Sequence, residues 1–209
     1  MKLINNEKLS EAIVNKEYFP YFCVENIFLD SVDSELVIND FPNILDGGSF
    51  HVDSLCSGES IIKLIEELES EEVKKILEEK FNINLKEAKA VTTLRGYSRK
   101  KDGKIHTDSK TKILTVLLYL NENWLDINGN LRLLKENKDL EDYIEEIPCT
   151  FGSLVSFKVT DECWHGFKPY EGKRLSIQLN YIYPEALSFH NLRHKLSSSL
   201  KSIFKKRRK

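Results

Sequence analysis

The sequence predicts a mainly β domain with helices at its N-terminal end. Between residues 60 and 81 the apolar residues recur at steps of three or four amid Glu and Lys, which is the period of an amphipathic helix. From residue 88 the pattern changes to short runs rich in Val, Ile, Thr, Tyr and Leu, separated by clusters of Gly, Asn, Asp and Lys. Many short strands at this spacing are typical of a β-sandwich or barrel. A length of 209 residues with 41% hydrophobic residues suffices for one such core and is short for two domains.

Two helices are expected within residues 60–81, and a shorter one precedes them. The apolar stripe of the two helices consists of Ile61, Leu64, Ile65 and Leu68, then Val73, Ile76, Leu77 and Phe81. Ser70 is a suitable N-cap for the second helix because its hydroxyl can accept a backbone N–H, and two Glu residues follow it. The shorter helix is expected near residues 33–40 and ends before Pro42.

The strands are expected in the second half of the chain, with glycine-containing turns between them. Their predicted ranges are 88–98, 112–121, 129–134, 144–148, 153–158, 163–168 and 172–182. The last strand has two faces of different kinds, since successive side chains alternate across a strand. One face carries Leu175, Ile177, Leu179 and Tyr181, and the other carries Arg174, Ser176, Gln178 and Asn180.

Charge is distributed unevenly along the chain. The net charge is −2, yet the last 20 residues contain eight Lys and Arg and no Asp or Glu, so an acidic body carries a basic tail. Apolar residues recur from just before this tail and along it, at Phe189, Leu192, Leu196, Leu200 and Ile203. Such a basic amphipathic helix suits an anionic membrane surface, an acidic partner or RNA, and it could equally dock on its own domain.

Composition excludes several classes of protein. A balanced charge excludes a uniformly basic nucleic-acid coat, and the apolar content excludes wholesale disorder. The longest apolar stretch, residues 113–120, is too short to span a bilayer. The four cysteines form no Cys-Xaa-Xaa-Cys pair, which indicates reduced, structural thiols. The first residues lack the apolar segment of a secretory signal, so we expect a cytoplasmic protein.

Two histidines and one aspartate are candidate metal ligands. His106 and Asp108 are separated by one residue, so in an extended chain both side chains project from the same face. His165, on a predicted strand further along, can supply a third ligand. Two imidazoles and one carboxylate form the facial set of non-haem Fe(II) oxygenases. The alternative for each histidine taken alone is an ordinary core or surface position.

Arg174 is the candidate partner of this site. It follows His165 by nine residues across a turn at Glu171-Gly172, which predicts that the two residues lie on adjoining antiparallel strands. A guanidinium is a planar fork suited to a bidentate carboxylate. The ligand expected from this pairing is a diacid, with one end on Arg174 and the other on the metal.

An ordered set of short motifs runs through residues 91–183. The set is Leu94-Arg95-Gly96-Tyr97, His106-Thr107-Asp108, Leu118-Tyr119-Leu120-Asn121, Gly129-Asn130-Leu131-Arg132-Leu133, Phe151-Gly152-Ser153-Leu154-Val155-Ser156-Phe157, His165-Gly166 and Arg174-Leu175-Ser176. In order and spacing it resembles the Fe(II)- and 2-oxoglutarate-dependent dioxygenases, specifically the prolyl 4-hydroxylase-like branch. Residues 21–29 are similar, more loosely, to the lead-in of the same branch.

The resemblance implies a double-stranded β-helix (jelly roll) core with helices packed outside its larger sheet. With the charge and hydrophobic patterns, we expect three parts of the chain: a helical lead-in (1–87), the core (88–184) and the basic tail (185–209). It implies that Fe(II) is bound by His106, Asp108 and His165. It further implies that 2-oxoglutarate is held through its distal carboxylate by Arg174 and Tyr119, with Ser176 as an additional donor and Tyr97 lining the pocket beside the metal. The activity implied is hydroxylation with O2, coupled to decarboxylation of 2-oxoglutarate to succinate and CO2.

The substrate stays open at the level of the sequence. Prolyl residues in a protein, a free amino acid, a glycan and a lipid-linked precursor are all compatible with the motifs. The basic segment 98–104, just before His106, is either a solvated loop or a clamp for an acidic substrate. Two other functions remain as alternatives: a non-catalytic jelly-roll binding module, and a surface adaptor that works through the basic tail.

Overall fold

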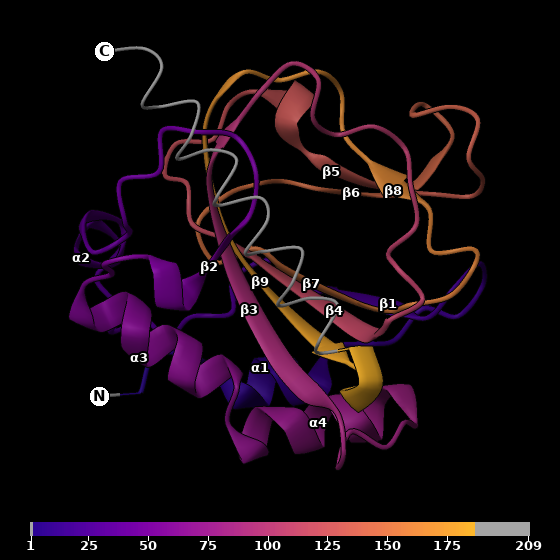
Figure 1. Cartoon of the computed structure of the whole chain (residues 1–209), viewed down its shortest axis with the longest axis horizontal. Helices are drawn as coiled ribbons and strands as arrows, with labels where there is room; N and C mark the ends of the chain where they lie inside the picture. The colour runs from indigo at the N-terminus through magenta and orange to yellow at the C-terminus, as the bar shows by residue number, and fades with distance from the viewer. Residues whose placement is uncertain (1, 187–209) are drawn as a thin grey trace.

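The computed structural model describes residues 2–186, and it shows four α-helices and nine strands in that range. Figure 1 shows the helices gathered on one side of a sandwich of two sheets. The helices are α1 (Asn6–Glu11), α2 (Ser34–Asn39), α3 (Glu59–Leu68) and α4 (Glu71–Phe81). The strands are β1 (Tyr21–Val24), β2 (Phe50–His51), β3 (Lys89–Ser98), β4 (Lys112–Tyr119), β5 (Leu131–Leu134), β6 (Tyr143–Ile147), β7 (Leu154–Lys158), β8 (His165–Gly166) and β9 (Gly172–Ile182). Short 3-10 turns lie at Val52–Ser54, Ile127–Gly129 and Pro184–Ala186.

The predicted helices are confirmed, and local hydrogen bonds explain where they begin. The Ser70 hydroxyl accepts the backbone N–H of Val73 at the start of α4, and Asp33 caps α2 in the same way. At the start of α3, the carboxylate of Asp40 accepts both the N–H and the hydroxyl of Ser60. Capping of this kind satisfies N–H groups that have no partner within the helix.

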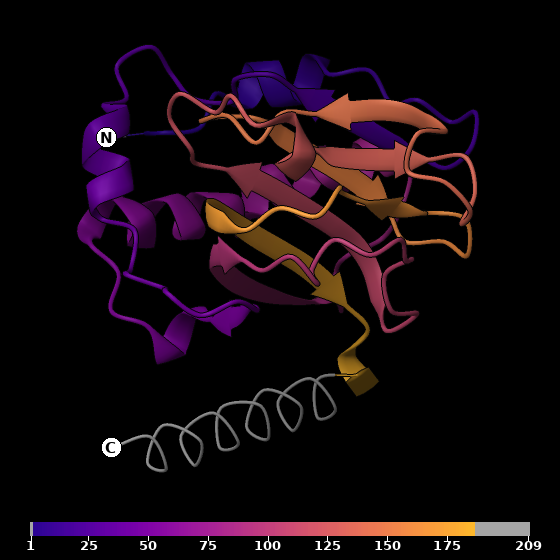
Figure 2. The same ribbon diagram turned by 90° about the horizontal axis from the view of Figure 1, so that it is seen from above.

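The strands form two antiparallel sheets that face each other. The larger sheet has the order β1-β7-β4-β9-β3-β2, and the smaller has the order β6-β5-β8. His106 extends the smaller sheet, because its backbone exchanges two hydrogen bonds of 3.0 Å with that of His165. Figure 2 shows the two layers from above. This arrangement is the predicted jelly roll.

The two faces of β9 divide as the alternation predicts. Leu175, Ile177 and Leu179 lie in the core between the larger sheet and the helices, together with Leu64 of α3 and Leu77 of α4. Burying each of these side chains stabilises the fold by about 1.5–3 kcal/mol. The other face of β9 points into the space between the sheets, which holds a second core and a cavity, and Tyr119 and Leu131 belong to both.

One predicted strand pairing is wrong. β8 pairs with β5 in the smaller sheet, whereas β9 pairs with β3 and β4 in the larger one, so His165 and Arg174 are not on adjoining strands. The connection 167–171 crosses from one sheet to the other, and the N–H of Phe167 holds it by donating to the carbonyl of Gly103. In a sandwich a short connection can join two sheets as well as two neighbours within one sheet.

Two further findings concern the ends of the chain and membranes. None of the helices within residues 2–186 combines the length and apolar composition that a membrane-spanning segment needs.

The predicted basic amphipathic helix, whose apolar stripe begins at Phe189, lies outside the described residues.

Candidate active site

A cavity of about 240 Å³ lies between the two sheets. Strands of both sheets and the segment around His106 contribute side chains to it. Its lining residues are Ser49, Arg95, His106, Asp108, Lys112, Leu117, Tyr119, Leu131, His165, Gly166, Phe167, Arg174, Ser176 and Gln178. The cavity therefore contains most of the site residues that the sequence singles out, and its lining as a whole comes from positions as far apart as Ser49 and Gln178.

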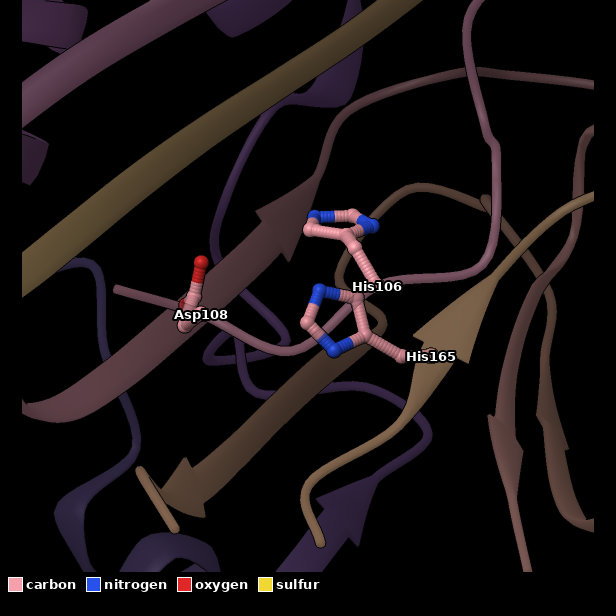
Figure 3. A group of neighbouring side chains, drawn as sticks. All are labelled: His106, Asp108 and His165. Atoms are coloured by element: carbon pink, nitrogen blue, oxygen red, sulfur yellow. The ribbon is translucent and has the colours of Figure 1, made fainter. Parts of the chain in front are cut away.

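His106, Asp108 and His165 lie together at one end of the cavity. Their potential ligand atoms all lie within 4.8 Å of one another. Figure 3 shows the three side chains gathered around a common space, with His165 on β8 and the other two on the segment between β3 and β4. His106 is exposed, Asp108 is partly buried and His165 is buried, so this group reaches from the interior to the surface.

Each histidine is oriented by a backbone carbonyl two residues before it. Nδ1 of His106 lies 2.8 Å from the carbonyl oxygen of Lys104, and Nδ1 of His165 lies 2.8 Å from that of Cys163. A carbonyl oxygen can only accept, so Nδ1 is the donor in both rings and Nε2 is the nitrogen left to bind a metal. Burial lowers the pKa of His165 to about 4, which keeps this ring neutral near pH 7. Both rings therefore have the tautomer that a metal ligand needs.

The Asp108 carboxylate is ionised and held in place by two neighbours. Lys112 Nζ lies 2.8 Å from one carboxylate oxygen, and the Thr115 hydroxyl donates to the other. Burial on its own raises the pKa of Asp108, but the charge of Lys112, the proximity of His165 and these hydrogen bonds outweigh it, so the pKa lies below its ordinary value. The carboxylate therefore presents a negative charge next to the two imidazoles.

Arg174 lies buried at the other end of the cavity, with 3% of its surface exposed. Its Nε donates to the carbonyl of Gly129 at 2.9 Å, and its Nη2 lies 3.3 Å from the hydroxyl of Tyr119. The guanidinium also stacks over the Phe167 ring, 4.2 Å from its centroid. No Asp or Glu among the described residues lies within ion-pair distance of it. A buried cation fixed in orientation but without a counter-charge is suited to an anionic ligand.

Tyr119 and Ser176 complete the Arg174 end. They lie directly opposite each other on β4 and β9, and both line the cavity. Burial raises the pKa of Tyr119, so its phenol remains protonated near pH 7. Because Arg174 donates to the phenol oxygen, the phenol O–H is free to donate to a ligand.

Tyr97, the remaining predicted site residue, does not line this cavity. A register shift between Arg95 and Tyr97 interrupts the pairing of β3 with β9, and Arg95 lines the cavity instead. The extra residue of this irregularity lies on β9, where Arg174 and Leu175 separate Ser176 from Lys173 while Gly96 alone separates Arg95 from Tyr97. Sequence spacing gives no sign of this bulge beyond Gly96, whose missing side chain lets Ile44 approach closely.

Asn130 directly precedes β5, in the motif Gly129-Asn130-Leu131-Arg132-Leu133. It has φ −61° and needs no left-handed conformation. Its side-chain oxygen instead accepts the indole N–H of Trp124 at 2.8 Å, which ties the loop before β5 to that strand. The neighbouring Gly129 is the restricted position, because a Cβ there would meet the Trp124 ring at 2.3 Å.

The donor set at the His106 end fits a divalent iron ion. Two imidazoles and one carboxylate on one side of an ion leave the remaining positions open for other ligands, which is the arrangement of non-haem Fe(II) oxygenases. Within the described residues, His106, Asp108 and His165 are the group of His, Cys, Asp and Glu side chains arranged in this way.

Comparison with protein families gives the same result. Residues 92–182 match the model of the 2OG-Fe(II) oxygenase superfamily. No curated protein matches the sequence. The matched segment runs from within β3 to the end of β9 and includes all three candidate metal ligands and Arg174.

Solved structures with a similar fold are prolyl hydroxylases. A prolyl 4-hydroxylase from Phytophthora capsici shares 16% identity over 88% of this chain and 67% of that chain, with a TM-score of 0.56. The viral collagen prolyl hydroxylase of Paramecium Bursaria Chlorella virus-1, in complex with 2-oxoglutarate (2OG), shares 13% identity over 80% of this chain and 97% of that chain, with a TM-score of 0.54. A prolyl hydroxylase from Trichoplax adhaerens, in complex with a peptide fragment of the hypoxia inducible factor oxygen degradation domain, shares 22% identity over 88% of this chain and 93% of that chain, with a TM-score of 0.52.

The fold and the cavity thus define an oxygenase of the jelly-roll class. Over residues 92–182 the chain matches the 2OG-Fe(II) oxygenase superfamily, and its fold is similar to that of prolyl hydroxylases. It is an Fe(II)- and 2-oxoglutarate-dependent dioxygenase, and Fe(II), 2-oxoglutarate and O2 are the cofactor and cosubstrates of its family.

Proposed function

We propose that the chain hydroxylates a residue of a peptide or protein, with Fe(II) held by His106, Asp108 and His165. One observation carries the proposal: a facial set of ligands and a buried, unpaired guanidinium at Arg174 occupy opposite ends of a single cavity. This pairing suits a keto diacid whose two ends differ, with its keto acid on the metal and its far carboxylate on the arginine.

The protein residues then have separate tasks. When bound, iron and 2-oxoglutarate supply the oxidising power for hydroxylation of a C–H bond, and the products of the cosubstrate are succinate and CO2. Arg174 and the Tyr119 hydroxyl hold the distal carboxylate, and Phe167 keeps the guanidinium plane in a fixed orientation. Lys104 and Cys163 fix the two imidazoles through their backbone carbonyls. No side chain acts as a nucleophile.

A large substrate is favoured by the position of the metal end. His106 is exposed, whereas Arg174 is buried, so a substrate can reach the metal from outside without entering the cosubstrate end. A side chain on a peptide needs only to enter the mouth of the cavity. The similar fold of the Trichoplax adhaerens prolyl hydroxylase, whose structure contains a peptide fragment, supports the same substrate class.

The test is incorporation of oxygen into peptides. Purified protein with Fe(II), ascorbate and 2-oxoglutarate is incubated with a peptide digest of a cell lysate, under ¹⁸O2, and the peptides are analysed by mass spectrometry. The proposal predicts peptides that gain one labelled oxygen, together with succinate, and no gain with His165→Ala. Turnover of 2-oxoglutarate that is stimulated by free amino acids or glycans and labels no peptide would contradict the substrate class.

Other expectations from the sequence remain predictions. Binding of an anionic membrane or RNA by residues 190–209 falls outside the described range. The basic loop before His106 has internal ion pairs, since Arg99 lies 2.9 Å from Asp102. Lys100 lies 3.8 Å from Glu171. These ion pairs are consistent with a solvated loop. The alternative, that the loop is a clamp for an acidic substrate, also remains a prediction.

A further inference from the structure

A second guanidinium, that of Arg95, lines the same cavity and has no part in the proposed function so far. Arg95 on β3 lies directly opposite Ser176 on β9, and Ser176 lies directly opposite Tyr119 on β4. These three strands lie side by side in the larger sheet (Figure 1). Directly opposite residues of antiparallel strands point to the same side, so Arg95, Ser176 and Tyr119 form one row across the wall of the cavity.

This row lies at the Arg174 end. At the metal end, Asp108 accepts a hydrogen bond from Thr115 of β4. Thr115 precedes Tyr119 by four residues, so Tyr119 and its row lie about 13 Å along the strand from Thr115. Arg174 and Tyr119 lie close enough to shift the pKa of Arg95, as do Arg99 and Asp102 of the neighbouring loop. Arg95 thus belongs to the cosubstrate end of the cavity.

Arg95 lacks a counter-charge. Its Nη2 donates to the Ser49 hydroxyl at 3.0 Å, and no carboxylate among residues 2–186 forms an ion pair with it. Burial and the nearby Arg174 guanidinium lower its pKa. Two cations that face one cavity without an anion repel each other, and an anion between them would remove this cost.

We propose that Arg95 is a second cosubstrate-binding arginine, which contacts the distal carboxylate of 2-oxoglutarate together with Arg174. This inference rests on the proposed function, in which that carboxylate lies at Arg174. A carboxylate accepts about four hydrogen bonds. Arg174 donates its Nε–H to the carbonyl of Gly129 and one Nη2 hydrogen to Tyr119, so these two hydrogens do not reach the ligand. The carboxylate can therefore accept further hydrogen bonds from Arg95, which makes Arg95 a specificity-determining residue for a diacid.

The experiment compares two ligands that differ only at the far end. 2-Oxoglutarate and 2-oxopentanoate share the keto acid, but the latter has a methyl group in place of the distal carboxylate. Dissociation constants are measured by anaerobic calorimetry on protein loaded with Mn(II), for wild type, Arg95→Gln, Arg174→Gln and Lys101→Gln. Lys101 is an exposed loop residue with no ion pair among the described residues, so its variant controls for the loss of one positive charge.

The expected result is that Arg95→Gln weakens 2-oxoglutarate binding about tenfold or more and leaves the affinity for 2-oxopentanoate unchanged. Lys101→Gln should alter neither affinity. If Arg95→Gln does not fold, Arg95→Lys replaces it, and the ratio of the two affinities should again shift toward 2-oxopentanoate.

Two outcomes would overturn the inference. Unchanged affinity for 2-oxoglutarate in the Arg95 variants, or an equal loss for both ligands, would show that Arg95 does not contact the distal carboxylate and would leave it free to bind an acidic group of the substrate. If Arg174→Gln weakens 2-oxoglutarate binding while Arg95→Gln does not, only the role of Arg95 fails. If wild type binds no 2-oxoglutarate, the proposed function itself fails.

Discussion

The two ends of the cavity are built in different ways. The metal end is held by a few backbone contacts: His106 and Asp108 are neighbours on one segment, the backbone of His165 pairs with that of His106, and each histidine is oriented by a carbonyl two residues away. The arginine end is built by the register of the larger sheet, which aligns residues of β3, β9 and β4 in one row. A local site depends on a few backbone contacts, whereas a site built by register depends on the whole sheet.

The charges at the two ends also differ. At the metal end Asp108 already has a cation, Lys112, at 2.8 Å. At the arginine end the guanidinium of Arg174 has no anion among the described residues. We therefore expect substitutions at the metal end to abolish chemistry, and substitutions at the arginine end to weaken one ligand in a graded way.

The largest effect is expected from Asp108→Ala. Loss of the carboxylate removes the anionic ligand of the metal, so succinate formation should fall by more than the ~100-fold that loss of a partner outside the coordination sphere typically costs. Succinate is measured with saturating Fe(II) and 2-oxoglutarate. Asp161→Ala, which removes an exposed aspartate paired with Lys110, is the control and should retain wild-type turnover. Substantial turnover by Asp108→Ala would break the metal-end assignment.

Arg174→Gln should act on the other end only. It removes a charge-assisted contact worth about 1.5–3 kcal/mol, which corresponds to a roughly 10- to 150-fold weaker affinity for 2-oxoglutarate. Metal affinity, measured by calorimetry with Mn(II), should stay the same because Arg174 does not contact the triad. An equal loss of metal affinity would show that the two ends are not independent.

Lys112→Met tests the ion pair at the metal end. Without metal, the variant leaves the buried Asp108 carboxylate uncompensated, so the free energy of unfolding should fall by about 3 kcal/mol. Adding Mn(II) supplies the missing positive charge, and the rise in Tm should therefore be larger in the variant than in wild type. Lys110→Met, whose pair is exposed, is the matched control. An identical metal-induced shift in Lys112→Met and wild type would contradict this role of Lys112.

The smallest effect is expected from Ser176→Ala. Its hydroxyl can add one neutral donor to the arginine end, and such a hydrogen bond contributes about 0.5–1.5 kcal/mol. The KM for 2-oxoglutarate should rise by no more than about tenfold, with kcat unchanged. A larger increase in KM would mean that Ser176 also positions its neighbours in the row, Arg95 and Tyr119, and does more than donate one hydrogen bond.

The sequence predicted the fold well because each element follows from a local pattern. The helical period around Leu64 and Leu77, the short β-rich runs and the alternation along β9 all appear in the structure. The pairing of β8 with β9 was wrong, because spacing along the chain does not tell whether a short connection stays within one sheet or crosses to another.

The site was predictable to the extent that its residues lie in recognisable motifs. His106, Asp108 and His165 lie together as expected, and Arg174, Tyr119 and Ser176 line the same cavity. Arg95 and Lys112 were not predicted as cavity residues. Arg95 lines the cavity from its regular position opposite Ser176, next to a register shift between β3 and β9, and the turn before β4 brings Lys112 back to Asp108. Both depend on backbone geometry that no residue type or spacing encodes.

The most direct test is an anaerobic titration of the iron-loaded protein with 2-oxoglutarate, followed by visible absorption. If the metal and the arginine hold the two ends of one keto diacid, wild type should develop a charge-transfer band that saturates. Asp108→Ala should develop none, and Arg174→Gln should require a higher concentration of 2-oxoglutarate. Absence of the band in folded wild type at saturating Fe(II) and 2-oxoglutarate would contradict the claim that the two ends of the cavity bind one molecule.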